Sequence, residues 1–433
     1  MSPFAIGIIG VLVLIIVLFS GMSVALVMAL VGFLGFSLLV SPDAALSLLA
    51  KDIFGEASKY SLTVVPMFIL MGQFAFYSGT GDRAFDTAYK FLGRVRGGLA
   101  IATAMACAIF AAVCGSTNAG AAAMGTVTIP EMKRYNYHPE LTTGCVAAGG
   151  SLSILIPPSV IFIVYGILTQ ISIGELFLAG ILPGLLLSIL FMITIIIICR
   201  IHPEYGPVGT SFSLREKLLS LTGIIDILIL FVLVMGGLFI GFFTPTEAGA
   251  VGAGGALVLA LAKKQITWQG ILKSVLDTAR LSCMVMFILV GAALFSHFIS
   301  VSRLPFVLSS WVGGSELPPV VIIAMIIVFY FIGGCFISTL ALIMVTVPIF
   351  FPVIKAINFD PVLFGVIIVL VTEMGVITPP VGVNVYIIKA IAQDVPLETI
   401  FKGIIPFLIA VVVTTILVII FPQIVLLLPN LVH

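Results

Sequence analysis

Four short stretches interrupt the apolar runs of this sequence, and their residue types suit the binding of a small cation. Residues 114–120 (CGSTNAG) and 333–339 (GGCFIST) each place hydroxyl or amide side chains inside an apolar segment. Two further segments contain adjacent prolines, Pro157-Pro158 and Pro379-Pro380. Oxygen atoms of serine, threonine and asparagine and free backbone carbonyls are suitable ligands for small hard cations. The four stretches therefore predict cation binding where helices are interrupted.

The composition defines the surroundings of these stretches. Of the 433 residues, 61% are hydrophobic and only 9% are charged, and the mean hydropathy is +1.34. These values are typical of a polytopic membrane protein. A formal net charge of +1 without a basic face argues against nucleic acid as a partner. The six cysteines occur singly without a CxxC motif, so we interpret them as buried apolar residues.

Apolar runs long enough to cross a bilayer recur along the whole chain, since a helical crossing needs about 20 residues. The first run lacks a signal-peptide cleavage pattern, so we expect it to be retained. Ten crossings are predicted at 4–20, 22–40, 60–78, 140–170, 174–200, 221–241, 244–262, 281–299, 361–392 and 400–428.

The chain contains an internal duplication. Pro130 to Pro139 and Pro352 to Pro361 share proline, lysine, asparagine, aromatic and proline positions, 222 residues apart (130 to 352). The same offset aligns the two proline pairs and aligns Ser116-Thr117 with Ser338-Thr339. We predict N-terminal scaffold helices at 1–59, a first repeat at 60–200, linking scaffold helices and a cytoplasmic arm at 201–280, and a second repeat at 281–433.

The two repeats are predicted to have opposite orientations. Residues 99–129 and 317–351 are each expected to form a re-entrant hairpin, and 140–170 and 361–392 a broken helix. Five crossings then separate the starts of the repeats, and an odd number inverts them. With the loop 79–98 inside, 15 of the 19 lysines and arginines are cytoplasmic, as the positive-inside rule requires, and both termini face the periplasm.

Interrupted helices at membrane depth have a physical cost that points to function. Backbone polar groups in lipid must be satisfied, so unwound backbone persists only where it is buried or lines a cavity. Each proline pair removes donors and frees carbonyls before it, and half-helix N-termini attract anions. A single proline pair would most simply be a structural kink. Four interruptions at matching offsets instead favour the binding centre of a secondary transporter.

At these residues the sequence resembles the large membrane subunit of tripartite ATP-independent periplasmic (TRAP) transporters, in the ion transporter superfamily. The matching pieces are CGSTNAGAAAMGTVTIPEMKRYNYHPELTTGCVAAGGSLSILIPPS, YGILTQISIGELFLAGILPG, FFTPTEAGAVGA and TEMGVITPPVGVNVY. The resemblance covers essentially the whole chain. At the first tip many relatives have a second serine or a glycine followed by proline, where this chain has Thr117-Asn118.

The resemblance implies a function and partners. It implies an elevator-type, sodium-driven importer of a small organic anion in the bacterial inner membrane. It also implies a four-helix small membrane subunit, which we expect as a separate chain, and a periplasmic substrate-binding protein.

The resemblance also leads to hypotheses for individual residues. Serines and threonines in membrane helices often bond only to their own helix, so each assignment has that alternative, and the two substrate-facing residues could instead pack against a neighbouring helix. The hypothetical first sodium site comprises Ser116, Asn118, Gly150 and Ser153; the second comprises Gly334, Ser338, Thr339, Thr372, Gly375 and Thr378; Ser159 and Asn384 are the candidate substrate contacts.

Several other charged residues have a structural or an open interpretation. Glu373 could bind a cation or a proton, or accept hydrogen bonds from broken backbone. Thr244 to Glu247, Ser172 to Glu175 and Ser213 to Glu216 have the spacing of helix-capping boxes. Residues 83–96 and 267–280 are predicted to be amphipathic helices at the cytoplasmic surface.

Other classes of function fit the sequence less well. No nucleotide-binding loop is present, so ion gradients would supply the work. An intramembrane enzyme would need a motif such as HExxH or paired aspartates, and Asp226 is nearly alone in an apolar span. A channel is a nearer alternative, and a stand-alone sodium/anion symporter of the same superfamily is nearer still. C4-dicarboxylates, sialic acid, 2-oxoacids and small sulfonates all remain open as the anion.

Overall fold

The computed structural model describes residues 1–314 and 317–432, and most of these residues are helical. Within these residues no β-strand forms, and an isolated bridge joins Arg96 to Val208. The all-α prediction is thus confirmed. By length and composition, 7 helices among the described residues could cross a membrane, or 8 if a pair bent by 46° counts as one span. The pair is Leu214–Gly223 with Ile225–Phe239, and several of the other expected crossings are shorter apolar helices.

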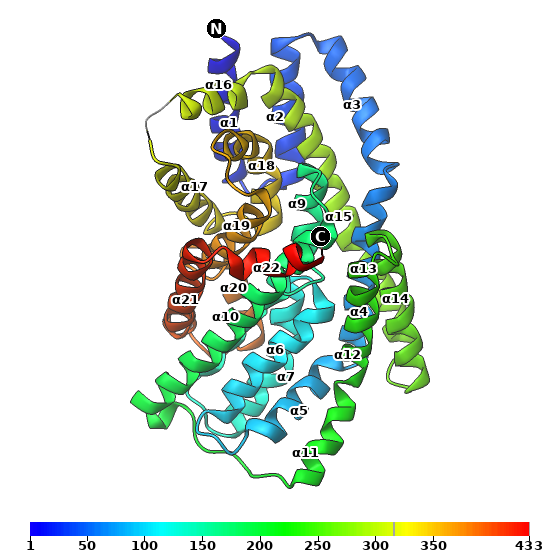
Figure 1. The fold of residues 1–433 in the computed structure, drawn as a ribbon, viewed down its shortest axis with the longest axis vertical. Helices are drawn as coiled ribbons and strands as arrows, with labels where there is room; N and C mark the ends of the chain where they lie inside the picture. Colours follow the sequence, from blue (N-terminus) through cyan, green and yellow to red (C-terminus); the bar gives the residue numbers. More distant parts are fainter. Residues whose placement is uncertain (315–316, 433) are drawn as a thin grey trace.

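The N-terminal helices lie at one end of the elongated molecule (Figure 1). Ser2 and Ser41 cap the first and third of them through their side chains. The third was not predicted, because its charged residues interrupt the apolar run. The helices are α1 (Pro3–Leu18), α2 (Val24–Leu39) and α3 (Pro42–Ala57).

The first repeat has the two interruptions expected from its sequence. A 3-10 turn, Tyr60–Thr63, leads into its first helix. The helices are α4 (Val64–Tyr77), α5 (Thr80–Leu92), α6 (Gly98–Cys114), α7 (Thr117–Arg134), α8 (Pro139–Leu155), α9 (Val160–Thr169) and α10 (Ile173–Ile201).

The linking region contains two of the predicted capping boxes. Ser213 with Glu216 and Thr244 with Glu247 form them in full, whereas Ser172 only accepts from the Glu175 amide. The Glu216 and Glu247 carboxylates accept hydrogen bonds from the backbone amides of Ser213 and Thr244. The helices are α11 (Leu214–Ser220), α12 (Ile225–Phe231), a π-helical turn (Val232–Gly236), α13 (Gly237–Phe239) and α14 (Pro245–Ala262).

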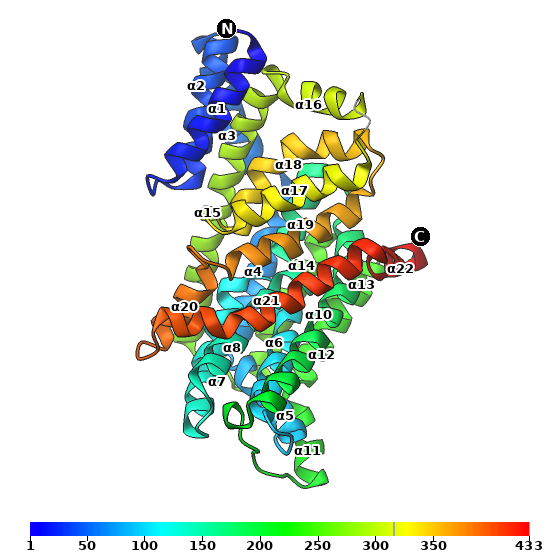
Figure 2. The same ribbon diagram turned by 90° about the vertical axis from the view of Figure 1, so that its left-hand side faces the viewer.

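The second repeat repeats the pattern of interruptions. Figures 1 and 2 show its hairpin, α17 and α18, on the opposite side of the molecule's middle from α6 and α7. The helices are α16 (Leu304–Gly313), α17 (Pro319–Gly334), α18 (Thr339–Ala356), α19 (Pro361–Val376), α20 (Val383–Ile391), α21 (Leu397–Ile420) and α22 (Gln423–Val432).

The predicted arm at 267–280 and the crossing at 281–299 are one helix. α15 runs from Trp268 to Val301 over 34 residues, because no proline or glycine lies near residue 280 to end it. The predicted domain boundary at 280 therefore falls within a helix. α15 packs closely on α2, where a Cβ at Gly291 would lie 2.5 Å from the Ala25 carbonyl oxygen.

Charged residues outside the polar stretches have partners that anchor helices. Asp226 on α12 lies 2.6 Å from Lys263 and 3.8 Å from Arg83 of α5, so it is not the isolated aspartate that the sequence suggested. His297 of α15 lies 3.4 Å from Asp52 of α3. All six cysteines are free; Cys283 is exposed, contrary to expectation, and the others are buried.

Candidate functional site

The first hairpin tip is a two-residue turn that needs a glycine. α6 ends at Cys114, and Gly115 follows with φ +66°, a conformation that favours glycine. A Cβ at Gly115 would lie only 2.8 Å from the Pro158 carbonyl oxygen. Ser116 then caps α7 by accepting a hydrogen bond from the Ala119 amide. The tip is therefore held against the break of the neighbouring helix.

The first proline pair breaks its helix later than the sequence suggested. α8 continues to Leu155, so Gly150 and Ser153 are helical rather than unwound; the unwound residues are 156–159. The reason is local, because a proline removes only the donor to the carbonyl four residues before it. Pro157 cannot donate to the Ser153 carbonyl, which is left free of its helical partner.

Two of the first candidate ligands, Gly150 and Ser153, lie where α8 packs on α7. A Cβ on Gly120 would lie 2.2 Å from Ser153 Oγ, and one on Gly150 would lie 2.6 Å from the Ala121 Cβ. α7 and α8 thus approach each other closely just behind the tip. Ser116 and Asn118 border the cavity at the tip, whereas Gly150 and Ser153 contact Ala121 and Gly120 of α7, so a shared sodium site of these four residues stays a prediction.

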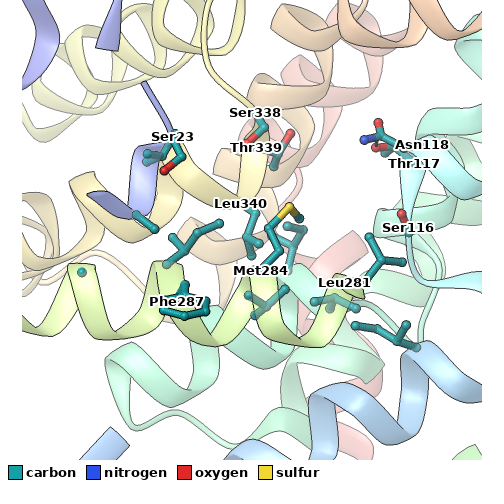
Figure 3. Close-up of a pocket in the computed structure, with 18 of the residues that line it drawn as sticks. Ser23, Ser116, Thr117, Asn118, Leu281, Met284, Phe287, Ser338, Thr339 and Leu340 are labelled. Atoms are coloured by element: carbon teal, nitrogen blue, oxygen red, sulfur yellow. Dashed lines mark hydrogen bonds between the residues drawn. The ribbon is translucent and has the colours of Figure 1, made fainter. Parts of the chain in front are cut away.

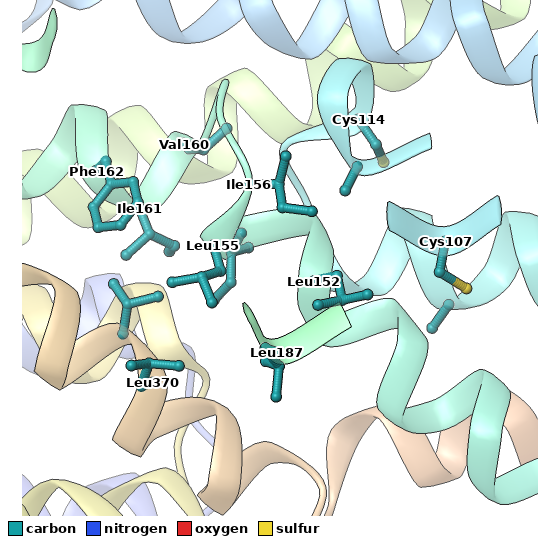
Figure 4. Close-up of a cluster of buried hydrophobic side chains, with 14 of the residues drawn as sticks. Cys107, Cys114, Leu152, Leu155, Ile156, Val160, Ile161, Phe162, Leu187 and Leu370 are labelled. Carbon is teal, nitrogen blue, oxygen red and sulfur yellow. The ribbon is translucent and has the colours of Figure 1, made fainter. Parts of the chain in front are cut away.

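Apolar side chains surround the unwound segment of the first broken helix. Figure 4 shows Leu152, Leu155 and Ile156 packed with Leu187 of α10 and Leu370 of α19. Leu152 and Leu155 are almost completely buried. Because the break lies within protein, its free backbone groups are shielded from lipid.

The second tip packs its backbone directly on the backbone of its broken helix. A Cβ on Gly375 would lie 2.4 Å from the Gly334 carbonyl carbon, so only glycine fits at this crossing of backbones. Thr339 at the start of α18 donates a hydrogen bond of 3.4 Å to Glu373 Oε1. The hydroxyls of Thr372 and Thr378 donate to carbonyls of their own helix, the alternative foreseen for such residues.

Both tips border one cavity of about 1090 Å³ (Figure 3). Ser116, Thr117 and Asn118 reach it from α7, and Ser338 and Thr339 reach it from α18. The opposite wall is apolar and comes from α15, with Leu281, Met284 and Phe287. None of the lining residues, all of them in the described part of the chain, carries a charge. The polar groups that this cavity offers to an anion are uncharged hydroxyl, amide and backbone groups.

The two candidate substrate contacts do not line this cavity. Ser159 is completely buried and caps α9, accepting from the Phe162 amide. Asn384 is also completely buried, and its Nδ2 donates to the Ala147 carbonyl of α8 at 3.2 Å. The proline turns place both residues at the buried starts of α9 and α20, where they cap a helix or join the repeats.

Two cavity residues were not recognised in the sequence. Gln73 of α4 and Ser23 before α2 both line the cavity, and Gln73 is nearly buried. Gln73 is an isolated amide within the run MFILMGQFAF, a signal that could have found it. Ser23 had no comparable signal.

The comparison with protein families decides the identity of this arrangement. Residues 11–424 match the model of the DctM component of the tripartite ATP-independent periplasmic transporter. The chain belongs to this family. It is therefore a multi-pass transporter subunit and not an enzyme, as the sequence predicted.

Similar large permease proteins align with nearly the whole of this chain. The C4-dicarboxylate TRAP transporter large permease protein DctM of Pseudomonas aeruginosa is 38% identical over 91% of each chain. The sialic acid TRAP transporter large permease protein SiaM of Vibrio cholerae is 33% identical over 96% of each chain. The ectoine/5-hydroxyectoine protein UehC of Ruegeria pomeroyi is 33% identical, covering 97% of this chain and 98% of its own.

Two solved transporter structures share the fold of this DctM-family chain. The Alcanivorax borkumensis YdaH transporter aligns with a TM-score of 0.64 at 14% identity, covering 92% of this chain and 97% of that one. Neisseria gonorrhoeae MtrF aligns with a TM-score of 0.53 at 14% identity, covering 86% and 83%. At this identity the comparison concerns the fold alone.

Proposed function

We propose that the chain is the large membrane subunit of a sodium-coupled importer of a small organic anion, a carboxylate or sulfonate. A periplasmic binding protein delivers the anion, and a small four-helix membrane subunit completes the complex in the bacterial inner membrane. Both termini face the periplasm. The carrier works by elevator-type alternating access between two inverted repeats.

One observation carries the proposal. Two polar hairpin tips, each packed on a proline-broken helix, meet at a single cavity without charged lining residues. Sodium ions held at the tips would supply the positive charge that such a cavity lacks for an anion. Relatives of the chain are named for C4-dicarboxylate, sialic acid and ectoine, which are all small polar solutes.

The ion gradient is sufficient to drive accumulation. Each positive charge that enters across about 100 mV contributes roughly 2.3 kcal/mol. Two sodium ions with one monoanion move one net positive charge inward, so the potential favours uptake. The sodium concentration gradient adds to this driving force.

Uptake into vesicles tests the proposal. The chain, its small subunit and its binding protein are reconstituted and offered a panel of anions with sodium or with choline. We expect sodium-dependent uptake of one anion class, and we expect the double variant Ser116→Ala with Thr339→Ala to abolish it. A double variant that transports normally would remove both proposed sodium sites.

The same measurement separates the alternatives. A stand-alone sodium/anion symporter would transport without an added binding protein. A channel would pass current without saturation or sodium dependence.

A further inference from the structure

The second hairpin site contains a carboxylate that has no counterpart in the first. Glu373 lies near the end of α19, beside Thr372 and two residues before Gly375. At the repeat offset of 222 residues (130 to 352), position 373 corresponds to Ser151. Ser151 is neutral, and its hydroxyl donates to the Ala148 carbonyl of its own helix at 2.6 Å. The two sites therefore differ by one formal charge.

The environment of Glu373 leaves one carboxylate oxygen without a partner. The residue is only 2% exposed. Oε1 accepts the hydrogen bond from Thr339, whereas Oε2 is buried and finds no hydrogen-bond partner within the described part of the chain. Among residues 1–314 and 317–432 no basic side chain forms an ion pair with it. A buried carboxylate oxygen without a partner is costly, so a native protein that keeps one normally supplies a partner.

The position of this oxygen indicates a cation as that partner. Glu373 lies behind the tip where Gly334 and Gly375 cross and beside the Thr339 hydroxyl. Because Thr339 donates its proton to Oε1, its oxygen lone pairs remain available to a cation. A buried carboxylate oxygen beside a hydroxyl oxygen offers the kind of ligands that suit a small hard cation.

We propose that Glu373 directly ligates the sodium ion of the second site. This inference rests on the proposed sodium coupling and adds a charged ligand to it. The second site is then neutral when filled, whereas the first site, built from neutral oxygens, gains a full positive charge. The anionic substrate is consequently drawn toward the first tip, at Ser116 and Asn118, rather than toward Thr339.

Sodium-dependent thermal unfolding of the full-length chain in lipid nanodiscs tests the inference, with choline replacing sodium at constant ionic strength. Glu373→Gln keeps the size of the side chain and removes its charge. We expect the sodium concentration for half-maximal stabilisation to rise at least tenfold, a change equivalent to about 1.4 kcal/mol. Glu373→Asp should show a smaller rise. Ser151→Ala, the matched control in the first repeat, should respond like the wild type.

Each outcome is informative. In choline, Glu373→Gln should unfold at a temperature no lower than the wild type, because it removes an uncompensated buried group. An unchanged sodium response in Glu373→Gln, beside a normal response in the wild type, would overturn this inference alone. A Glu373→Gln protein that is much less stable in choline would also overturn it, by showing that the carboxylate has a protein partner. A wild type without any sodium response would instead reject the proposed coupling, and this inference with it.

Discussion

The two hairpin tips perform the same structural task with different chemistry. The first is a two-residue turn with a left-handed glycine, and its serine caps the following helix. The second spans the four residues between Gly334 and Thr339, and its serine makes no capping bond. Behind the first tip, Gly120 and Gly150 lie against the side chains of Ser153 and Ala121, whereas Gly375 at the second tip lies against backbone alone. The duplicated halves have thus kept their architecture while the atoms at each tip have diverged.

The largest expected effect comes from adding a methyl group where a tip meets its broken helix. At Gly375 the added Cβ would meet only backbone atoms of Gly334 and Cys335, so nothing can move aside cheaply. Overpacking typically costs about 1–3 kcal/mol, and we expect Gly375→Ala to slow sodium-dependent uptake at least about tenfold.

At Gly150 the nearest atom is the Ala121 Cβ. Gly150→Ala should therefore be partly rescued by Ala121→Gly.

Initial uptake rates in vesicles, at equal amounts of inserted protein, measure these variants. Wild-type transport by Gly375→Ala would show that the close approach of the second tip is dispensable. If Ala121→Gly does not raise the uptake rate of Gly150→Ala, the proposed difference between a side-chain contact at the first tip and a backbone contact at the second is wrong.

A smaller effect should separate the two tip serines. Loss of an N-cap side chain typically costs about 0.5–2 kcal/mol. Since Ser116 caps α7 and Ser338 makes no such bond, Ser116→Ala should lower the free energy of unfolding by about 0.5–1 kcal/mol, and Ser338→Ala should leave it unchanged. Chemical or thermal unfolding in sodium-free buffer measures both. Equal losses in the two variants would contradict the difference in capping.

The smallest effect concerns an exposed contact between the repeats. Lys133 at the end of α7 forms an ion pair with Asp394, which follows α20. The hydrogen bond from Lys133 lowers the Asp394 pKa. The ion pair therefore stabilises the fold at pH values above the ordinary aspartate pKa of about 3.9. This stabilisation is lost as the pH falls through the lowered pKa of Asp394 in the folded protein. Asp394→Asn should destabilise the protein slightly at pH 7. At a pH below the lowered pKa of Asp394 it should have no effect on stability.

Unfolding temperatures of the wild type and Asp394→Asn, measured from pH 7 down to below the Asp394 pKa, check this prediction. Arg134→Gln, which removes a pair with Glu131 within α7 alone, is the matched control. A difference between wild type and Asp394→Asn that grows as the pH falls would contradict the sign.

The sequence predicted the interruptions of the helices better than their extent. Proline pairs and glycine-rich polar tips lie where α6, α8, α17 and α19 end, because these residues act on backbone geometry directly. The unwound stretch was placed too early, since a proline lacks one donor and frees only the carbonyl four residues before it, while the helix continues to Leu155. α3 was missed because its charged residues interrupt the apolar run from which membrane helices were predicted. Asn384 could not be assigned from sequence, since its partner Ala147 is 237 residues away.

The continuity of α15 also limits how the molecule can deform. Its 34 residues extend for about 50 Å at the usual rise of 1.5 Å per residue. Glycines at both contacts, Gly32 and Gly291, seat it directly on the backbone of α2. The helix therefore has no hinge between its ends. A displacement at Trp268 must move α15 as a rigid body as far as Val301, together with α2.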